Sequence, residues 1–219
     1  MTDSDNKIFV VDDDASVRRS TARLLHSAGY EVETLATAEA YLNLRNARGA
    51  GCLVLDLQMP GLNGLQLQQA LIDADMEVPI VFVSGRGNIP SSVQAMKRGA
   101  VDFLTKPYDQ KDFLEAIKKA LYKGEQLRKS RSEQKSIDNR LEHLTHRERQ
   151  VLSQVVKGKL NKQIAMALKI SEKTVKVHRA RVMEKMRVES VAALVRMTEK
   201  IQARDDASSE ARKIFQPAS

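Results

Sequence analysis

The first half of the chain alternates short apolar runs with amphipathic segments, and no other feature restricts its fold as strongly. Five runs rich in Val, Ile, Leu and Phe have the composition of strands and lie at 7–11, 31–35, 52–56, 79–84 and 101–105. Segments with helical patterns follow them, at 16–28, 38–46, 64–74, 90–98 and 109–123. Strands joined by helices form a parallel sheet that is covered on both faces. We therefore predict an α/β domain with a doubly wound parallel sheet.

Residues 143–200 lack strand signals and are predicted to form a separate all-α domain of four short helices. The charge divides the chain in the same way. Residues 1–124 hold 14 Lys and Arg against 16 Asp and Glu, a net charge of −2, whereas residues 125–219 hold 22 against 12, a net charge of +10. Such a basic half favours a polyanionic partner, although a solvated basic surface would explain the charge alone equally well.

We divide the chain into a first domain at 1–124, a connector at 125–142, a basic domain at 143–200 and a tail at 201–219. The connector has only a sparse apolar pattern. We predict that it is a solvated helix continuing the helix of 109–123, with a flexible coil as the alternative. The tail is small and polar, a composition for which disorder is the default.

The sequence gives no sign of a membrane segment or of an oxidising compartment. No apolar run approaches the roughly 20 residues of a membrane span, and the acidic start MTDSDNK differs from a signal peptide. The single cysteine, Cys52, lies in the apolar run GCLVLDL and is expected to be buried rather than reactive. We expect a soluble, cytoplasmic protein that makes no membrane contact.

Polar and charged residues end four of the predicted strands. In chain order they are Asp12, Asp13, Asp56, Ser84 and Lys106. Ligands bind at the carboxyl ends of strands in open parallel sheets, so we expect these five side chains to gather at one edge. Clustered carboxylates repel one another unless a cation joins them, and their oxygens suit Mg²⁺. A lysine and a hydroxyl beside such a cation would receive an anion, which indicates phosphoryl transfer to a carboxylate.

The same stretches resemble a known family. The pattern VVDDD, LVLDLQMPGLNG, VFVSG and DFLTKP strongly resembles the receiver domain of bacterial two-component response regulators over residues 7–123. The resemblance implies a (βα)5 fold with strand order 2-1-3-4-5, Mg²⁺ as cofactor, a sensor histidine kinase as partner and a cis Lys106–Pro107 bond. It also implies these roles: Asp56 as phosphoacceptor; Asp12, Asp13, Asp56 and the backbone carbonyl of Gln58 as Mg²⁺ ligands; Lys106 and Ser84 as phosphoryl-binding residues; and Phe103 as the aromatic switch residue.

The basic domain contains a predicted helix at 171–185, SEKTVKVHRARVMEK, for which Ser171 is a good N-cap. Its apolar stripe consists of Val175, Val182 and Met186, with Arg179 at the margin. The opposite face is mostly basic and carries Lys173, Lys176, Val177, Ala180, Arg181 and Glu184. A short helix, NKQIAMAL, precedes it across a tight turn. This is the helix-turn-helix arrangement that lays its second helix in the major groove of DNA.

Residues 143–200 closely resemble the LuxR-type four-helix DNA-binding domain, so the whole chain resembles the NarL/FixJ subfamily of response regulators. The stretch VSGRGNIPSSVQAMKRGAVDFLTKP favours the FixJ branch. The resemblance implies base contacts by Lys176 and Val177, while the replacement of a longer side chain by Ala180 leaves one base contact in doubt. Contacts to phosphates or flanking bases are implied for Asn161, Lys162, Lys173, Thr174, His178 and Arg181. For Arg179 we prefer an ion pair with Glu148 over a DNA contact, and we expect no metal at His146 or His178.

The resulting hypothesis is a transcription regulator that is activated by phosphorylation and catalyses no reaction other than its own phosphorylation and dephosphorylation. Its partners would be a sensor histidine kinase, double-stranded promoter DNA, RNA polymerase and, after phosphorylation, a second copy bound through Val93, Lys97 and Val101. A phosphatase of the haloacid dehalogenase type is the enzymatic alternative, but it needs a second Asp two residues after the first, where this chain has Gln58. An interaction module without DNA binding would leave the basic helix unexplained.

Overall fold

The computed structural model describes residues 7–44, 51–85 and 89–199. The chain separates into two compact units, with the division between Lys129 and Ser130. The predicted tail, 201–219, lies outside the described residues, as do 45 and 46 at the end of the predicted helix 38–46. No helix among the described residues combines the length and the apolar character needed to cross a membrane.

The first unit contains a five-stranded sheet in which all four strand pairs are parallel. The strands are β1 (Ile8–Val11), β2 (Val32–Leu35), β3 (Cys52–Asp56), β4 (Ile80–Ser84) and β5 (Asp102–Thr105). Their order is β2-β1-β3-β4-β5, which confirms the predicted topology. The three central strands are buried along their whole length, as expected of continuous apolar runs in a parallel sheet.

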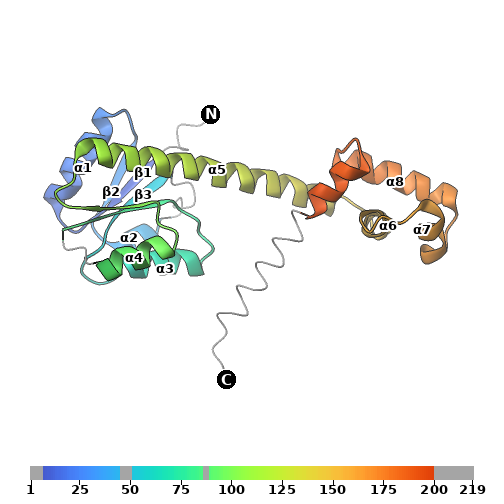
Figure 1. Ribbon diagram of the computed structural model, residues 1–219, viewed down its shortest axis with the longest axis horizontal. Coiled ribbons are helices and arrows are strands. Elements are labelled where there is room, and N and C mark those ends of the chain that lie inside the picture. Colours follow the sequence, from blue (N-terminus) through green and yellow to red (C-terminus); the bar gives the residue numbers. More distant parts are fainter. Residues whose placement is uncertain (1–6, 45–50, 86–88, 200–219) are drawn as a thin grey trace, which may run out of the picture. The chain divides into compact units, whose positions relative to one another are not determined.

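Helices cover both faces of this sheet (Figure 1). One face packs against α1 (Ala15–Ser27) and the first part of α5 (Gln110–Glu142). The other face packs against α2 (Ala38–Leu42), α3 (Gly64–Asp73) and α4 (Ile89–Lys97). Each face has its own apolar core, and Cys52 is fully buried in the core beneath α1 and α5, as predicted.

Two local features fix the loops at the carboxyl edge of the sheet. A Cβ atom at Gly64 would overlap the backbone oxygen of Asp56, so only glycine lets α3 begin this close to the end of β3. The peptide bond between Lys106 and Pro107 is cis, as the family resemblance implies. Both features lie beside residues that the sequence identified as candidates for the site.

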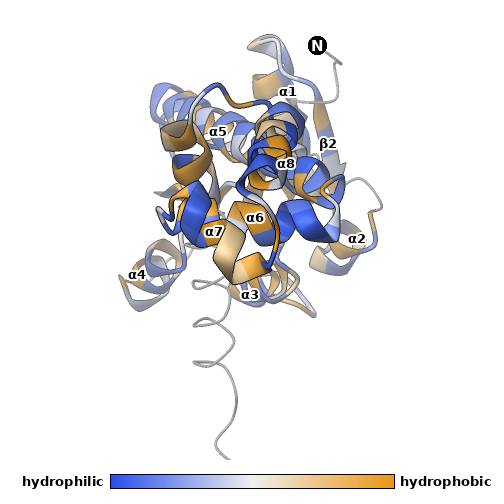
Figure 2. Ribbon diagram, turned by 90° about the vertical axis from the view of Figure 1, so that its right-hand side faces the viewer, coloured by the Kyte–Doolittle hydropathy of each residue, from blue (hydrophilic) through white to orange (hydrophobic). Residues whose placement is uncertain are grey.

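The second unit contains α6 (His146–Val156), α7 (Asn161–Leu168), α8 (Glu172–Met186) and a fourth helical stretch at 191–199, which confirms the four predicted helices. Ser171 caps α8 by accepting a hydrogen bond from the Thr174 N–H, also as predicted. Hydrophobic and hydrophilic segments alternate along α6, α7 and α8 (Figure 2). The apolar stripes meet in one core that includes Val175, Val182 and Met186.

The segment 125–142 is helical as the last part of α5, but it is not simply a solvated connector. Ile137 and Leu141 pack against the core of the second unit. These two residues are four positions apart and therefore lie on the same side of the helix. The sequence pattern looked sparse because only one turn of the segment needs apolar residues.

Candidate functional site

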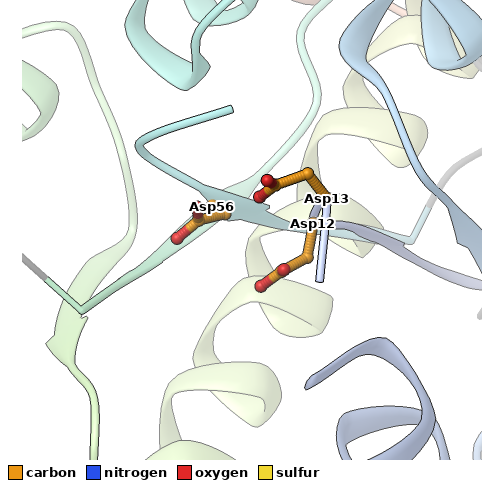
Figure 3. A group of neighbouring side chains, drawn as sticks. All are labelled: Asp12, Asp13 and Asp56. Atoms are coloured by element: carbon orange, nitrogen blue, oxygen red, sulfur yellow. The ribbon is translucent and has the colours of Figure 1, made fainter. Parts of the chain in front are cut away.

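Three carboxylates meet at the carboxyl edge of the sheet. Asp12 and Asp13 follow β1, and Asp56 is the last residue of β3; one oxygen atom of each lies within 4.8 Å of the others (Figure 3). Asp12 is 1% exposed and Asp56 is 6% exposed, whereas Asp13 is open to solvent. The expected cluster therefore forms, with the carboxylates of Asp12 and Asp56 buried and that of Asp13 exposed to water.

Lys106 provides the positive charge inside this cluster. Its Nζ atom lies 2.6 Å from Oδ2 of Asp12 and 3.3 Å from Oδ1 of Asp56. Burial raises the pKa of Asp56, the Lys106 charge opposes that rise, and the neighbouring charge of Asp12 adds to it. Burial alone would lower the pKa of Lys106, but the hydrogen bond to Asp12 and the charge of Asp56 outweigh it, so the pKa is raised. Lys106 is therefore held in its charged form.

Ser84 and Phe103 come from β4 and β5, the two strands that follow β3 toward one side of the sheet. Ser84 is 1% exposed at the end of β4, and its backbone carbonyl accepts a hydrogen bond from the N–H of Lys106 at 2.8 Å. Phe103 is half-buried on β5, with its ring stacked on that of Phe82 at a centroid distance of 6.1 Å. Strand ends thus bring Ser84 and Lys106 to the same edge as the carboxylates. Phe103 lies three residues before Lys106 and packs against the core on the α4 side of the sheet.

The donor set at this edge fits a hard divalent cation. All three side chains of the cluster offer carboxylate oxygens, and Lys106 balances only part of their charge. Because the Asp13 carboxylate is exposed, an ion from solvent can reach the cluster at this residue. The backbone of Gln58 lies beside the cluster, where it opposes the rise in the pKa of Asp56.

Arg18 belongs to this site and was missed at the sequence level. Its Nη1 atom donates to the backbone carbonyl of Asp12 at 2.6 Å and to that of Asp13 at 2.9 Å. The guanidinium thereby fixes the loop that presents both carboxylates. The available signal was position, because an arginine in the second turn of α1 can reach back over the residues that precede the helix.

A second candidate site is the basic surface of α7 and α8. The residues with implied base or phosphate contacts that are exposed are Lys162, Lys173, Lys176, Val177 and Arg181. Those that are half-buried are Asn161, Thr174 and His178. The exposed residues of α8 lie around the buried stripe, so the helix has one face for packing and another for a partner.

One predicted contact in this unit is wrong. Arg179 does not pair with Glu148; its Nη1 atom donates to Oδ1 of Asn161 at 2.7 Å and so links α8 to α7. Glu148 is 2% exposed and pairs instead with Lys185, whose Nζ atom lies 2.7 Å from Oε2. Arg179 lies about 1.7 helical turns before Lys185 on α8, and at that level it meets the start of α7 rather than α6.

The Glu148 carboxylate also closes the N-terminal cap of α6, because it accepts a hydrogen bond from the Thr145 N–H at 2.8 Å. The hydrogen bond from Lys185 and those from Thr145 lower the pKa of Glu148 to about 2. Within the described ranges, the only group of three close His, Cys, Asp or Glu side chains is the acidic cluster, so neither His146 nor His178 belongs to such a group.

The residues expected at a dimer contact lie around α4. Val93 is 45% exposed, Lys97 is exposed, and Val101 is half-buried just before β5. Two further apolar side chains of α4, Ile89 and Met96, are exposed to 79% and 44% and were not identified from the sequence. This helix therefore presents an apolar surface with a cation at its C-terminal end.

Comparisons with known proteins agree with both halves of the chain. Residues 8–118 match the response regulator receiver domain family, and residues 142–198 match the luxR family of bacterial regulatory proteins. The response regulator protein TmoT from Ectopseudomonas mendocina is 43% identical over 201 residues, which cover 92% of this chain and 91% of TmoT.

Two solved structures are similar over nearly the whole chain. That of the response regulator StyR has a TM-score of 0.78 and 45% identity, covering 90% of this chain and 99% of StyR. That of full-length FixJ from B. japonicum has a TM-score of 0.54 and 39% identity, covering 89% of this chain and 96% of FixJ.

Proposed function

The chain belongs to the bacterial response regulators of the FixJ-like branch, which join a receiver domain to a LuxR-type DNA-binding domain, and on this premise we propose how its residues work. Asp56 accepts a phosphoryl group from a sensor histidine kinase. Its carboxylate oxygen bonds to phosphorus while the phosphorus–nitrogen bond of the phosphohistidine breaks, and the histidine nitrogen keeps the electron pair. The observation that carries this assignment is the position of Asp56 at the end of the central strand, beside Lys106 and two other carboxylates.

Asp12, Asp13, Asp56 and the backbone carbonyl of Gln58 would hold Mg²⁺. When bound, this ion supplies positive charge that offsets the repulsion between the carboxylates and an incoming phosphoryl group. Lys106 donates a hydrogen bond to a phosphoryl oxygen, in exchange for its present bonds to Asp12 and Asp56. The Ser84 hydroxyl donates to another. Phe103 then changes its packing against Phe82 as the switch residue.

The change at Ser84 and Phe103 reshapes the neighbouring surface of α4, and two receivers pair through Val93, Lys97 and Val101. Pairing brings two basic domains onto adjacent half-sites of promoter DNA, where RNA polymerase is recruited. Lys176 and Val177 read base edges, and Lys162, Lys173 and Arg181 contact phosphates, with Asn161, Thr174 and His178 beside them. A protein with these partners acts in the cytoplasm. In this proposal the receiver domain is 1–124, the helical linker is 125–142, the DNA-binding domain is 143–200 and the tail is 201–219.

The phosphoacceptor is tested by chemical modification. We expect acetyl phosphate with Mg²⁺ to add one phosphoryl group to the full chain, located on Asp56 by mass spectrometry. The Asp56→Asn variant should remain unmodified, and Asp14→Asn, which changes the exposed carboxylate directly after Asp13 but outside the cluster, should be modified like the wild type. A phosphoryl group on Asp56→Asn would overturn the assignment.

The DNA sequence that the chain prefers can be identified from a random duplex library. The full chain treated with beryllofluoride is incubated with the library, and the bound DNA is sequenced. The most enriched duplex, called the selected duplex below, is then compared with a scrambled duplex of the same composition.

A further inference from the structure

The recognition helix α8 is tied at its C-terminal end to Arg140, which precedes the LuxR-family match, and to His143, which lies at the start of that match. Arg140, on α5, donates from Nη1 to the backbone carbonyl of Met186 at 3.1 Å. Lys185 donates to the backbone carbonyl of His143 at 3.2 Å. Both contacts lie within the second unit. The end of α8 is therefore bonded to the final turn of α5 and to the loop that follows it.

The first of these contacts fills a place that a helix leaves open. The last carbonyls of a helix have no partner within it, and the aligned peptide dipoles give that end a partial negative charge. In α8 the chain leaves the helix at Arg187, which has a left-handed backbone with φ of 52° and whose N–H turns back to Glu184 and Met183. The guanidinium of Arg140 donates to the free backbone carbonyl of Met186, and its positive charge complements the partial negative charge at this end of the helix.

Arg140 is itself held in position from three directions. Its Nη2 atom donates to Oγ of Ser136 one turn earlier, at 3.2 Å. On either side of it, Ile137 and Leu141 pack into the core that contains Met186. The Arg140 side chain is half-buried, so its two hydrogen bonds are partly shielded from water.

We propose that Arg140 is a positioning residue for DNA recognition, which fixes the orientation of α8 without touching DNA. This inference rests on the proposed role of Lys176 and Val177 in reading bases. Met186 is ten residues beyond Lys176, or about 15 Å along the helix axis, so Arg140 acts on the base-reading residues through the helix. A small tilt at the anchored end moves side chains at the other end out of register with base edges.

The test compares three variants of the full chain with the wild type. Arg140→Ala removes the contact, and Arg140→Lys keeps a cationic donor that can reach the same carbonyl. Lys135→Ala is the matched control, because it removes one positive charge from an exposed position on the same part of α5. Binding to the selected and scrambled duplexes is measured at several salt concentrations.

We expect Arg140→Ala to bind the selected duplex about tenfold more weakly, as for loss of a hydrogen bond to a charged group. Its affinity for the scrambled duplex and its salt slope should remain those of the wild type, because phosphate contacts are intact. Arg140→Lys should recover most of the loss, and Lys135→Ala should behave like the wild type. A salt slope reduced by about one in Arg140→Ala would show that Arg140 contacts phosphate, and equal behaviour of Arg140→Ala and Lys135→Ala would also overturn the proposal.

A measurement without DNA separates this proposal from the proposed function. Hydrogen exchange of backbone amides in 183–190 should be faster in Arg140→Ala than in the wild type, while exchange in 146–156 stays unchanged. Unchanged exchange at 183–190 would mean that Arg140 does not hold the end of α8. Faster exchange together with a wild type that does not distinguish the two duplexes would leave the contact in place and contradict the proposed base reading instead.

Discussion

The two units keep their charged residues in opposite surroundings. In the first unit Asp12 and Asp56 are nearly buried, and Lys106 lies between them. In the second unit the candidate DNA contacts, such as Lys162 and Lys176, stand on exposed helix faces. A buried charge is costly without a partner, whereas an exposed one is already solvated. We therefore expect changes in the acidic cluster to be strongly coupled and changes on the basic surface to be nearly additive.

The pair of Glu148 and Lys185 resembles the acidic cluster of the first unit, because a buried carboxylate is paired with a lysine. Removing this pair should give the largest effect on stability. Glu148→Ala leaves Lys185 without its carboxylate and opens the cap of α6, so we expect a loss of about 3–5 kcal/mol in the free energy of unfolding of this unit. Glu184→Ala, which removes an exposed carboxylate from the neighbouring position of α8, should cost under about 0.5 kcal/mol. Urea dependence of hydrogen exchange in α6 and α8 measures both.

The same pair predicts how the second unit responds to acid. The pKa of Glu148 is lowered to about 2 in the folded chain, below its ordinary value of 4.5. A carboxyl with a depressed pKa contributes its full stability above the ordinary value and loses it as pH falls toward the folded value. The second unit of the wild type should thus lose stability between about pH 4.5 and 2. An equal loss over that range in Glu148→Ala would exclude Glu148 as its cause.

Lys176→Ala should have the next largest effect, confined to sequence preference. A lysine that donates to guanine O6 and N7 gives about 1–3 kcal/mol of discrimination. We expect the variant to bind the selected duplex more weakly and to lose most of its preference over the scrambled duplex. Lys169→Ala serves as the control, since that exposed residue lies in the turn between α7 and α8. A parallel loss on both duplexes in Lys176→Ala would mean that the residue contacts only phosphate.

Asp13→Ala tests the acidic cluster of the first unit, where changes are expected to be coupled. Removal of the solvent-facing carboxylate should weaken Mg²⁺ binding on the order of tenfold, which corresponds to about 1.4 kcal/mol. Asp14→Ala should bind Mg²⁺ like the wild type, because Asp14 caps α1 and is not part of the cluster. Titration with Mg²⁺ monitored by calorimetry gives both values. If Asp13→Ala retained full affinity, the ion would have to bind elsewhere.

Lys162→Ala should give the smallest change. Loss of one phosphate contact lowers affinity for both duplexes in parallel and reduces the salt slope by about one. Combined with Lys176→Ala, the two losses should add within about 0.5 kcal/mol, as for independent sites. By contrast, Asp13→Ala and Lys106→Ala should not add in Mg²⁺ affinity. Strongly non-additive affinity losses in the Lys162→Ala and Lys176→Ala double variant would contradict the expected difference between the basic surface and the acidic cluster.

The sequence predicts the first unit well because its candidate site lies at strand ends. Apolar runs locate the strands, the ends of parallel strands share one edge, and the residues that gather there follow without further information, as Asp56 and Lys106 show. Arg18 was missed because its contacts are to backbone carbonyls, which leave no trace in side-chain types.

Contacts between helices are harder to predict than strand ends. Helical periodicity identified the buried stripe of α8 but not which partner lies opposite each margin. Arg179 was assigned to Glu148 on charge alone, whereas the structure gives that place to Lys185 and lets Arg179 meet Asn161. The segment 125–142 was predicted to be a solvated connector, because the core against which Ile137 and Leu141 pack is formed by residues much later in the chain, such as Met186.

In the proposed function, modification of Asp56 in one unit controls DNA binding by the other. The most direct test measures the affinity of the full chain for the selected duplex in the presence of Mg²⁺, before and after treatment with acetyl phosphate. The wild type should gain affinity, whereas Asp56→Asn, measured in parallel, should not. Equal affinity of the treated and untreated wild type, with Asp56 phosphorylated according to mass spectrometry, would contradict it.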